Sequence, residues 1–296
     1  MLQHLNTKPH HPERVIIMGA GGFVGSAISN KLLSEGIETL PLGRNDVDLL
    51  QSDAVEKLLD LIKPGDSFVA VSAIAPVKNS KMLVDNLRLA QTITSALSKR
   101  NDDIVHVINI GSDAVYSDIS TPLLESSHTA PTNYHGIMHV AREVMFVNEI
   151  NAPLVTLRPT LIYGAGDTHN GYGPNQFCRL ANAGKEIVLF GEGEELRDHV
   201  LIDDVAEIAC LALLHRSHGI INVATGRVTS FLEIANRVSN LTNPSVAVQT
   251  SPRTGPMPHN GYRAFNNSVT SKCFPSFQYT LIEDGLQKCF DTIAPI

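Results

Sequence analysis

A glycine-rich stretch near the start of the chain has residue types and spacing suited to binding a phosphate. It follows the short apolar run Arg14–Met18 and leads directly into a sequence with helical spacing. Glycines there permit a tight turn and a close approach of the backbone to a pyrophosphate, while the start of the helix offers free N–H groups. A strand, a glycine turn and a helix in this order predict a dinucleotide-binding site; the alternative is a structural turn without a ligand. The predicted contacts are Gly19, Gly21, Gly22, Phe23, Val24 and Gly25.

The residues after the second apolar run indicate which dinucleotide is bound. An acidic side chain at this place normally accepts the ribose 2′-hydroxyl of NAD. Here Gly43 occupies the acidic position and Arg44 stands beside it, which favours a 2′-phosphate and therefore NADP(H). NAD(H) stays open, because a solvated surface charge is the alternative role of Arg44. The predicted cofactor pocket is completed by Asp48, Leu49, Ser72 and Ala73.

Apolar runs and helical patterns alternate steadily over the first half of the chain. This rhythm predicts an α/β fold with a doubly wound parallel sheet of the Rossmann type, covered by helices on both faces. The alternation then breaks, and a smaller C-terminal α/β lobe is expected to bind the substrate. We predict a dinucleotide-binding domain at 14–165 and about 199–225, a substrate-binding lobe at about 166–198 and 226–296, and a flexible N-terminus at 1–13.

Composition and charge limit the classes of protein that fit this chain. Its 296 residues are 43% hydrophobic and 18% charged, which suits a globular protein with a substantial core. A net charge of -7 and a pI near 5.9 argue against nucleic-acid and anionic-membrane partners, and no apolar run approaches the ~18–20 residues that span a bilayer. The polar N-terminus and the absence of CxxC spacing predict a cytoplasmic protein with reduced thiols. No metal site is predicted, since the histidines near the N-terminus fall in the flexible segment.

Several ordered motifs resemble those of the extended short-chain dehydrogenase/reductase family, in particular its nucleotide-sugar epimerases, dehydratases and 4-keto-reductases. The resemblance runs from Arg14 to about Asp291. The glycine turn is similar to the family's GxxGxxG, carried by Gly19, Gly22 and Gly25. INIGSDAVYS resembles its serine strand, LRPTLIYG the segment after its sixth strand, and LFGEGEELRDHVLIDDVAEIA its diphosphate-binding stretch. Their common order makes the resemblance specific.

The resemblance implies catalytic roles for particular side chains. Moving a hydride to or from a sugar carbon requires a proton to reach or leave the attached oxygen at the same time. By the family's pattern, Tyr134 shuttles that proton, Ser112 holds the oxygen in line, and Asn86 is the central-helix asparagine. Asp113, next to the serine, is either a proton donor or a turn residue bonded to the backbone.

The position four residues after Tyr134 departs from the family. A lysine there, one helical turn on, would favour the phenolate and hold the nicotinamide ribose, but this chain has Met138. The missing charge predicts a slow site or one that only binds ligands, whether the methionine is natural or engineered. His135 and His139 are expected on other faces of the helix. The remaining alternative is that Tyr134 is a chance tyrosine on a core helix.

The neighbours of Ser112 distinguish the reactions of the family. Its dehydratases carry an acid and a base directly after the catalytic hydroxyl, whereas Ala114 stands at the base position here, which argues against dehydration. The short connection after the second strand resembles NADPH-dependent 4-keto-6-deoxysugar reductases, so an NADP(H)-dependent 4-keto-sugar reductase is favoured. An NAD(P)-dependent nucleotide-sugar 4-epimerase and a non-catalytic regulatory or ligand-binding member are the alternatives.

A nucleotide-diphosphate sugar is the ligand that the resemblance implies for the lobe. The helices expected at 80–99 and 134–150 resemble a pair that forms a four-helix dimer contact in the family, so a homodimer is expected; the alternative is that one subunit covers their apolar faces. For the arginines of the lobe, surface ion pairs are the alternative role. The predicted substrate contacts are Arg197, the strongest candidate, and Asn175, Arg253 and Arg263.

Overall fold

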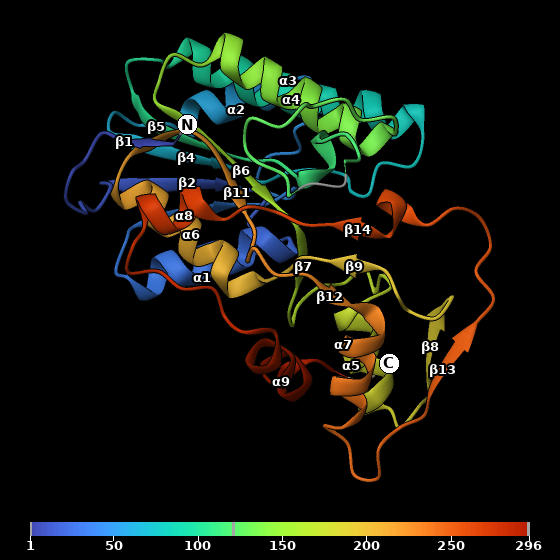
Figure 1. Ribbon diagram of the computed structural model, residues 1–296. Helices are drawn as coiled ribbons and strands as arrows, with labels where there is room; N and C mark the ends of the chain where they lie inside the picture. Colours follow the sequence, from blue (N-terminus) through green and yellow to red (C-terminus); the bar gives the residue numbers. More distant parts are fainter. Residues whose placement is uncertain (1, 120–121, 295–296) are drawn as a thin grey trace.

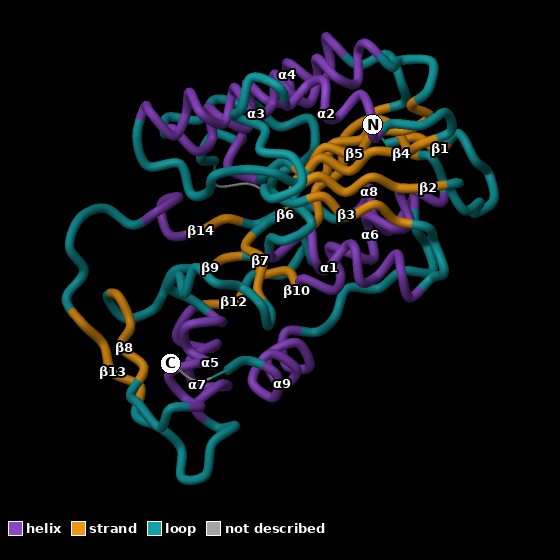
Figure 2. The backbone as a smooth tube through the Cα atoms, turned by 180° about the vertical axis from the view of Figure 1, so that it is seen from behind, coloured by secondary structure: helices purple, strands orange, loops and turns teal. Residues whose placement is uncertain are grey.

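A seven-stranded sheet with the order β1-β11-β6-β5-β4-β2-β3 forms the centre of the molecule. The computed structural model describes residues 2–119 and 122–294, and Figures 1 and 2 show the sheet between two layers of helices. Apart from the pairing of β1 with β11, its neighbouring strands run in parallel. The strands are β1 (Gln3–His4), β2 (Arg14–Met18), β3 (Thr39–Leu42), β4 (Asp66–Ala70), β5 (Ile104–Ile110), β6 (Leu154–Pro159) and β11 (Ser217–Val223).

Helices cover both faces of this sheet. Alternate residues of β2 serve the two layers: Val15 and Ile17 pack with α1 and α6, while Ile16 and Met18 pack with α2, α3 and α4. A parallel strand buried on both faces reads as a continuous apolar run, which explains the sequence RVIIM. The doubly wound Rossmann-type fold is confirmed. The helices are α1 (Phe23–Ser34), α2 (Ala54–Leu61), α3 (Ser80–Lys99), α4 (Tyr134–Glu149) and α6 (Ile202–Leu214).

Strand β2 marks the point where the strand order reverses. It lies between β3, which forms one edge of the sheet, and β4, from which the order continues through β5 and β6. The connections leaving the carboxyl ends of β2 and β4 therefore diverge, and ligands of doubly wound sheets bind in the crevice that results. The Gly19–Gly25 turn follows β2 directly, so the fold places it at this crevice.

A smaller lobe lies below the sheet in Figure 1 and has its own apolar core, which contains Phe177, Ile234 and Leu286. Its helices are α5 (Pro174–Asn182), α7 (Phe231–Ser239) and α9 (Ile282–Thr292). Short strand pairs accompany the lobe and its junction with the sheet: β7 (Leu161–Tyr163) with β10 (His199–Leu201), β9 (Leu196–Arg197) with both β12 (Thr229–Ser230) and β14 (Tyr262–Arg263), and, within the lobe, β8 (Ile187–Phe190) with β13 (Val248–Ser251). Across the two described ranges, no helix is both long and apolar enough to cross a membrane.

Helix α8 (Ser268–Cys273) departs from the predicted lobe boundary at 226–296. It packs against β11, and Phe274 joins the apolar layer formed with α1 and α6 under the sheet. Phe277 and Tyr279 pack against the same layer. The chain therefore returns to the dinucleotide-binding domain before it forms α9.

Residues 2–4, which fall in the stretch 1–13 predicted to be flexible, pack against the edge of the sheet. Strand β1 pairs antiparallel with β11, and Leu2 is buried. His4 hydrogen-bonds through Nδ1 to the Ser217 hydroxyl at 2.8 Å and through Nε2 to the Cys273 carbonyl at 3.0 Å. The segment thereby covers the backbone groups that β11 would otherwise expose at the sheet edge. These partners lie more than 200 residues away in the sequence, so no local pattern indicates them.

Candidate active site

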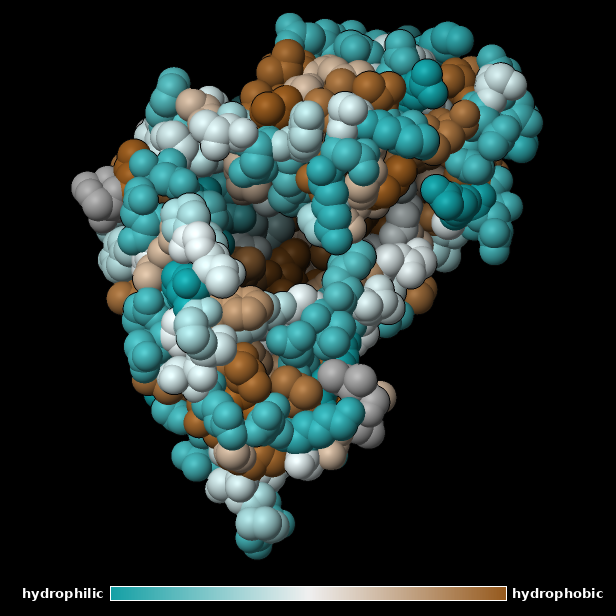
Figure 3. All heavy atoms as spheres, turned by 90° about the vertical axis from the view of Figure 1, so that its right-hand side faces the viewer, coloured by the Kyte–Doolittle hydropathy of each residue, from teal (hydrophilic) through white to brown (hydrophobic). Residues whose placement is uncertain are grey.

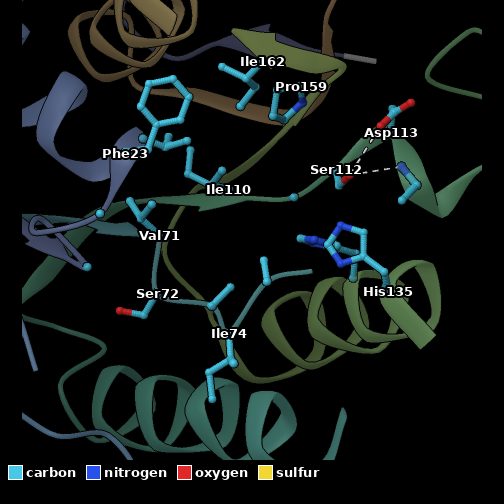
Figure 4. A pocket seen from close by; sticks show the side chains of 18 of the residues that line it. Phe23, Val71, Ser72, Ile74, Ile110, Ser112, Asp113, His135, Pro159 and Ile162 are labelled. Carbon is cyan, nitrogen blue, oxygen red and sulfur yellow. Dashed lines mark hydrogen bonds between the residues drawn. The ribbon is translucent and has the colours of Figure 1, made fainter. Parts of the chain in front are cut away.

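A cavity of about 1060 Å³ opens at the carboxyl ends of the sheet strands. Its walls are the connections after β2, β3, β4 and β5, the first turns of α4, and β7. Figure 3 shows the hollow between the sheet and the lobe, with apolar residues at its floor. In Figure 4, Phe23, Val71, Ile110 and Ile162 form an apolar wall, and Ser112 lies at the other side. A large, mostly apolar cavity with a few polar groups is typical of cofactor and small-molecule sites.

The glycine turn forms one end of the cavity and leaves no room for side chains. Gly19 has a φ of +104°, and a Cβ atom there would lie 2.7 Å from the Ser72 nitrogen. A Cβ atom on Gly25 would lie 2.1 Å from the Gly19 carbonyl oxygen. Gly22 is the N-cap of α1 and offers no side chain to its free N–H groups, so these remain available to a phosphate. The residues of the turn that line the cavity are Gly19, Gly21, Gly22, Phe23 and Val24, whereas Gly25 packs the turn onto its helix.

The connection after β3 forms the next part of the wall. Gly43 and Arg44 line the cavity, and the Asp46 carboxylate fixes their turn by accepting the Gly43 N–H at 2.8 Å. Hydrogen bonds from Leu50 N–H and the Gln51 side chain lower the pKa of the neighbouring Asp48, which also lines the cavity with Leu49. Arg44 is exposed, and among the described residues no hydrogen bond or ion pair engages its guanidinium. This is an arrangement that fits a 2′-phosphate.

Asn86 holds the connection after β4 in place. Its Oδ1 accepts the Ile74 N–H at 2.8 Å, and its Nδ2 donates to the carbonyls of Ile74 at 3.0 Å and Met82 at 2.8 Å. These bonds fix the segment in which Ser72 and Ala73 line the cavity. Asn86 itself is 2% exposed and does not line the cavity. Asn86, predicted among the catalytic residues, therefore positions this segment from behind the cavity wall.

Ser112 and Asp113 stand at the end of β5, where a short 3-10 helix, η1 (Asp113–Val115), begins. The Ser112 hydroxyl accepts the Ala114 N–H at 3.1 Å and donates to Asp113 Oδ1 at 3.4 Å. The other carboxylate oxygen of Asp113 accepts the Nε–H of Arg263 at 2.8 Å. Arg263 is 2% exposed and lies behind the cavity wall. It therefore holds Asp113 in position, and the structure corrects its predicted role as a diphosphate contact.

Helix α4 presents histidines to the cavity. His135 and His139 line it, with ring centroids 4.8 Å apart and planes at 85°, and Figure 4 shows His135 beside Ser112. Tyr134 is 45% exposed and Met138 is 1% exposed, and neither lines the cavity. Tyr134 and Met138, predicted at the positions of the catalytic tyrosine and of the missing lysine, therefore lie outside the cavity, and the residue that follows each of them lines it.

The rotation of α4 about its axis explains why His135 lines the cavity and Tyr134 does not. The helix begins at Tyr134 because the Asn133 side chain caps it by accepting the Gly136 N–H at 2.9 Å. Gly136 faces η1 so closely that a Cβ atom there would lie 2.3 Å from the Ala114 carbonyl oxygen. At about 100° per residue, Tyr134 points about 160° away from this contact. His135 flanks the contact and faces Ser112.

Burial controls the charge of the two histidines. It lowers the pKa of His135, while the nearby Asp113 carboxylate raises it. Burial lowers the pKa of His139 well below its ordinary range, and the adjacent His135 and Arg142 act in the same direction. The Nδ1 atoms of both rings are buried and have no hydrogen-bond partner among the described residues. We therefore describe two neutral imidazoles at neutral pH, one of which faces the serine hydroxyl.

Two charged residues anchor α4 to the sheet behind the histidines. Arg142 donates to the carbonyls of Ser72 at 2.7 Å and Ala70 at 2.8 Å, and its burial lowers its pKa to about 10. Glu143 forms a bidentate pair with Arg158 of β6, with N···O distances of 2.9 and 2.6 Å. These contacts fix the rotation of α4 about its axis.

Arg197 stands at the lobe side of the cavity. It lines the cavity from β9 and is paired with the buried Glu195 at 3.0 Å. Asn175 and Arg253, like Arg263, do not line the cavity. The Asn175 amide is engaged by Gly164 N–H and Asp167 at 2.8 Å each, and Arg253 donates to the Phe190 carbonyl at 3.0 Å. Of the predicted substrate contacts, the structure leaves Arg197 as the candidate for an anionic ligand.

The family model described as the NAD dependent epimerase/dehydratase family matches residues 15–224. This chain belongs to that family. It is 24% identical to the trifunctional UDP-glucose 4,6-dehydratase/UDP-4-keto-6-deoxy-D-glucose 3,5-epimerase/UDP-4-keto-L-rhamnose-reductase of Arabidopsis thaliana over 95% of the chain. It spans about half, 47%, of the length of that relative. GDP-L-fucose synthase 1 of the same plant is 24% identical over 77% of each protein.

Solved structures of the family share the fold. A GDP-L-fucose synthetase from Naegleria fowleri bound to NADP superposes with a TM-score of 0.82 and 19% identity, covering 98% of this chain and 96% of that one. The UDP-glucose 4-epimerase of Thermotoga maritima, solved with UDP-glucose, has a TM-score of 0.83 and 19% identity over 94% and 98% of the two chains.

The sequence analysis placed His135 and His139 on other faces of the helix, whereas both line the cavity in the structure. The family resemblance implies a catalytic tyrosine, so Tyr134 was assigned this role. Two local signals indicate how α4 is rotated about its axis: Asn133 is a strong N-cap residue, and Gly136 marks a close approach of α4 to η1. Together they place the tyrosine at the first helical position and turn His135 and His139 toward η1.

Proposed function

We propose that this protein is an NADP(H)-dependent oxidoreductase that reduces the 4-keto group of a nucleotide-diphosphate sugar. One observation carries the proposal: a single cavity joins the glycine turn and Arg44 at one end to Ser112 in the middle and Arg197 at the lobe. An adenine dinucleotide with a 2′-phosphate would occupy the first end, and a diphosphate the last. The distance between the ends is bridged by apolar residues such as Phe23.

The residues around Ser112 support reduction of a carbonyl. When bound, the reduced nicotinamide supplies a hydride. Ser112 can donate a hydrogen bond to the carbonyl oxygen when its O–H turns away from Asp113 Oδ1, a long contact of 3.4 Å, while the Ala114 N–H holds the hydroxyl oxygen in place. Asp113 is held by Arg263, and alanine follows it where a dehydratase base is expected. The site therefore has groups to hold and protonate an oxygen, while Ala114 offers none to remove a proton from carbon.

A reductase activity is among those named for the relatives, and this supports the proposal. The trifunctional Arabidopsis relative is named as a 4,6-dehydratase, a 3,5-epimerase and a UDP-4-keto-L-rhamnose-reductase, and the Naegleria structure was solved with NADP. The unpaired Arg44 beside Gly43 supports NADP(H) over NAD(H) for this chain.

The test is NADPH consumption with a panel of nucleotide-linked 4-keto sugars that includes UDP-4-keto-L-rhamnose. We expect turnover with at least one sugar and a reduced alcohol as product. The Arg197→Gln variant should raise KM for that sugar at least tenfold while the Kd for NADPH stays within twofold. Interconversion of UDP-glucose and its 4-epimer without net cofactor consumption would instead identify a 4-epimerase and overturn the proposal.

A non-catalytic, ligand-binding member of the family is the second candidate function. It is supported by one observation: in the described ranges no lysine lines the cavity, and Tyr134 lies outside it. The same panel decides between the two. NADPH and a nucleotide sugar that bind to the wild-type protein without turnover would establish this second function.

We also propose that two copies associate through α3 and α4. Their outer face exposes aliphatic side chains, and Figure 3 shows apolar residues along the top of the molecule. Such a patch on adjacent helices is characteristic of a subunit contact. Sedimentation should give a dimer, and a Val147→Glu change should shift it to the monomer. The exposed residues are Val84 at 48%, Ile137 at 41%, Val144 at 54% and Val147 at 66%.

A further inference from the structure

We propose that His135 is the catalytic residue that transfers the proton to the substrate oxygen, and that His139 is its uncharged neighbour in place of a cation. The proposal rests on the proposed reduction and names the group that completes it. A family tyrosine and lysine are thereby replaced as a pair by two histidines, and the change alters how the reaction depends on pH.

The geometry brings His135 and Ser112 to the same point of the cavity. Both side chains line it, and Figure 4 shows the imidazole beside the serine hydroxyl. The hydroxyl is oriented by the Ala114 N–H at 3.1 Å. The buried Nδ1 of His135 has no partner in the part of the chain that the structure describes. A hydroxyl that holds an oxygen and an imidazole beside it form the two contacts that carbonyl reduction requires.

The step balances with these groups. With a reduced nicotinamide bound as the hydride source, the carbonyl carbon would gain a hydride and the C=O π pair would move onto the oxygen. An N–H bond of the protonated His135 ring breaks as the new O–H bond forms, so the imidazolium becomes a neutral imidazole. Solvent returns the proton before the next turnover. Ser112 donates its hydrogen bond throughout and loses no proton.

The two replacements are chemically consistent with each other. A tyrosine has an ordinary pKa near ~10 and needs an adjacent cation to reach its phenolate, whereas a histidine titrates near ~6.5 without one. A lysine at position 139 would repel the proton on His135, whose ring centroid lies 4.8 Å from that of His139. Burial keeps His139 uncharged by holding its pKa well below the ordinary range.

Burial and the charge of one neighbour, Asp113, set the balance of the protonation of His135. On its own helix, His139 is neutral, and Arg142 lies one turn further and is bonded to the Ser72 and Ala70 carbonyls. From η1, Asp113 favours the protonated ring.

The charged groups at the lobe side of the cavity and behind η1 are paired with one another. Arg197 is paired with Glu195, and Arg263 is shared between the carboxylates of Asp113 and Asp118. His259 lines the cavity and contacts Asp118. Asp113 is thus the charge that most directly opposes the effect of burial on His135.

The sign of the pH dependence follows. The proton donor is the imidazolium, and burial places the pKa of His135 below its ordinary value. The reduction rate should therefore rise as pH falls through a pKa below ~6.5 and level off under it. The reverse oxidation uses the neutral ring and should be limited at low pH instead.

The decisive variant is His135→Ala, assayed by NADPH consumption with the most active 4-keto sugar of the panel. We expect kcat to fall by about 100-fold to 10,000-fold, with the NADPH Kd within twofold of wild type, and free imidazole in the buffer to restore part of the rate. His128→Ala, which removes an exposed histidine outside the cavity, is the matched control and should retain the wild-type rate. Tyr134→Phe tests the competing assignment and should also retain it.

A readout that does not use turnover tests the electrostatics. Histidine side-chain NMR of the protein alone should show one ring, assigned by loss in His135→Ala, that titrates below ~6.5. Asp113→Asn should lower that pKa further, since the carboxylate favours the protonated ring.

The outcomes separate this inference from the proposed function. No turnover by wild type with any sugar, despite bound NADPH, overturns the reductase function and with it the proton transfer. Turnover by wild type that persists within threefold in His135→Ala, or that is lost in Tyr134→Phe, leaves the reductase function standing and overturns the role of His135. A large loss in His135→Ala with imidazole rescue, and a titration that moves with Asp113→Asn, establishes it.

Discussion

The two ends of the cavity are built by opposite means. At the glycine turn, the requirement is that side chains be absent, since a Cβ atom on Gly25 would lie 2.1 Å from the Gly19 carbonyl oxygen. At the start of α4, the requirement is that two side chains point one way, and Arg142 and Glu143 fix the rotation that achieves it. The glycine turn would bind through its backbone, whereas the start of α4 presents side chains whose direction depends on the rotation of the helix.

This difference determines how each end responds to change. At the glycine turn, an added side chain would collide with the backbone at the substituted residue itself. At α4, the site would be lost if the helix rotated about its axis, and the residues that prevent this rotation lie away from the cavity: the Glu143–Arg158 pair does not line it. Substitutions behind α4 should therefore alter the chemistry without touching a ligand, whereas substitutions behind the glycine turn should have little effect on it.

Glu143→Ala should have the largest effect. It leaves the Arg158 guanidinium, with a side chain 4% exposed, buried without its bidentate partner, and breaking such a pair costs about 3–5 kcal/mol of unfolding free energy. Chemical denaturation measures this. Glu149→Ala, at the exposed end of the same helix, should change stability by less than about 0.5 kcal/mol. Equal effects of the two variants would show that the pair does not anchor α4.

Met138→Lys should lower stability by about 3 kcal/mol, because Met138 is 1% exposed and the ammonium would be buried without a partner. It should not increase turnover, since position 138 does not line the cavity. Thermal unfolding and the 4-keto sugar assay test the two parts. An increase in turnover would show that residue 138 corresponds to the family's lysine and would contradict the rotation of α4 described above.

Gly25→Ala should lower stability by about 2 kcal/mol, in the range of substitutions that overfill a packed site, and should abolish NADPH binding. Gly21→Ala is the matched variant, since a Cβ atom there would meet nothing within 4 Å; its stability should stay within about 1 kcal/mol of wild type. If both variants unfold alike, the collision at Gly25 is not the cause.

The sequence predicted what depends on local patterns. Apolar runs such as RVIIM, followed by glycines and a helical pattern, indicate strand, turn and helix because each feature acts over a few residues. From these the parallel sheet follows, and with it a crevice at the carboxyl ends of the strands, where Gly19 and Arg44 line the cavity.

The remaining features depend on contacts between distant residues. Arg263 holds Asp113 from 150 residues away, so its prediction as a substrate contact could not take into account that it is already paired with this carboxylate. The pairing of His4 with Ser217 spans 213 residues. At α4 the sequence gives the helix correctly, but its phase is set by the contact of Gly136 with Ala114. A one-residue error there exchanges Tyr134 for His135.

Arg44→Ser should have the smallest effect and acts on the cofactor end alone. Its guanidinium lines the cavity without an ion pair within the described ranges, so removing it costs little stability but loses a charge-assisted contact with a 2′-phosphate. The NADPH Kd should rise about tenfold, or about 1.4 kcal/mol, while the NADH Kd stays constant. Arg227→Ser, at an exposed arginine outside the cavity, should change neither. Equal losses of affinity for NADPH and NADH would mean that Arg44 does not bind the 2′-phosphate. The pH dependence of turnover should be unchanged in Arg44→Ser, because the proton is handled at the opposite end of the cavity.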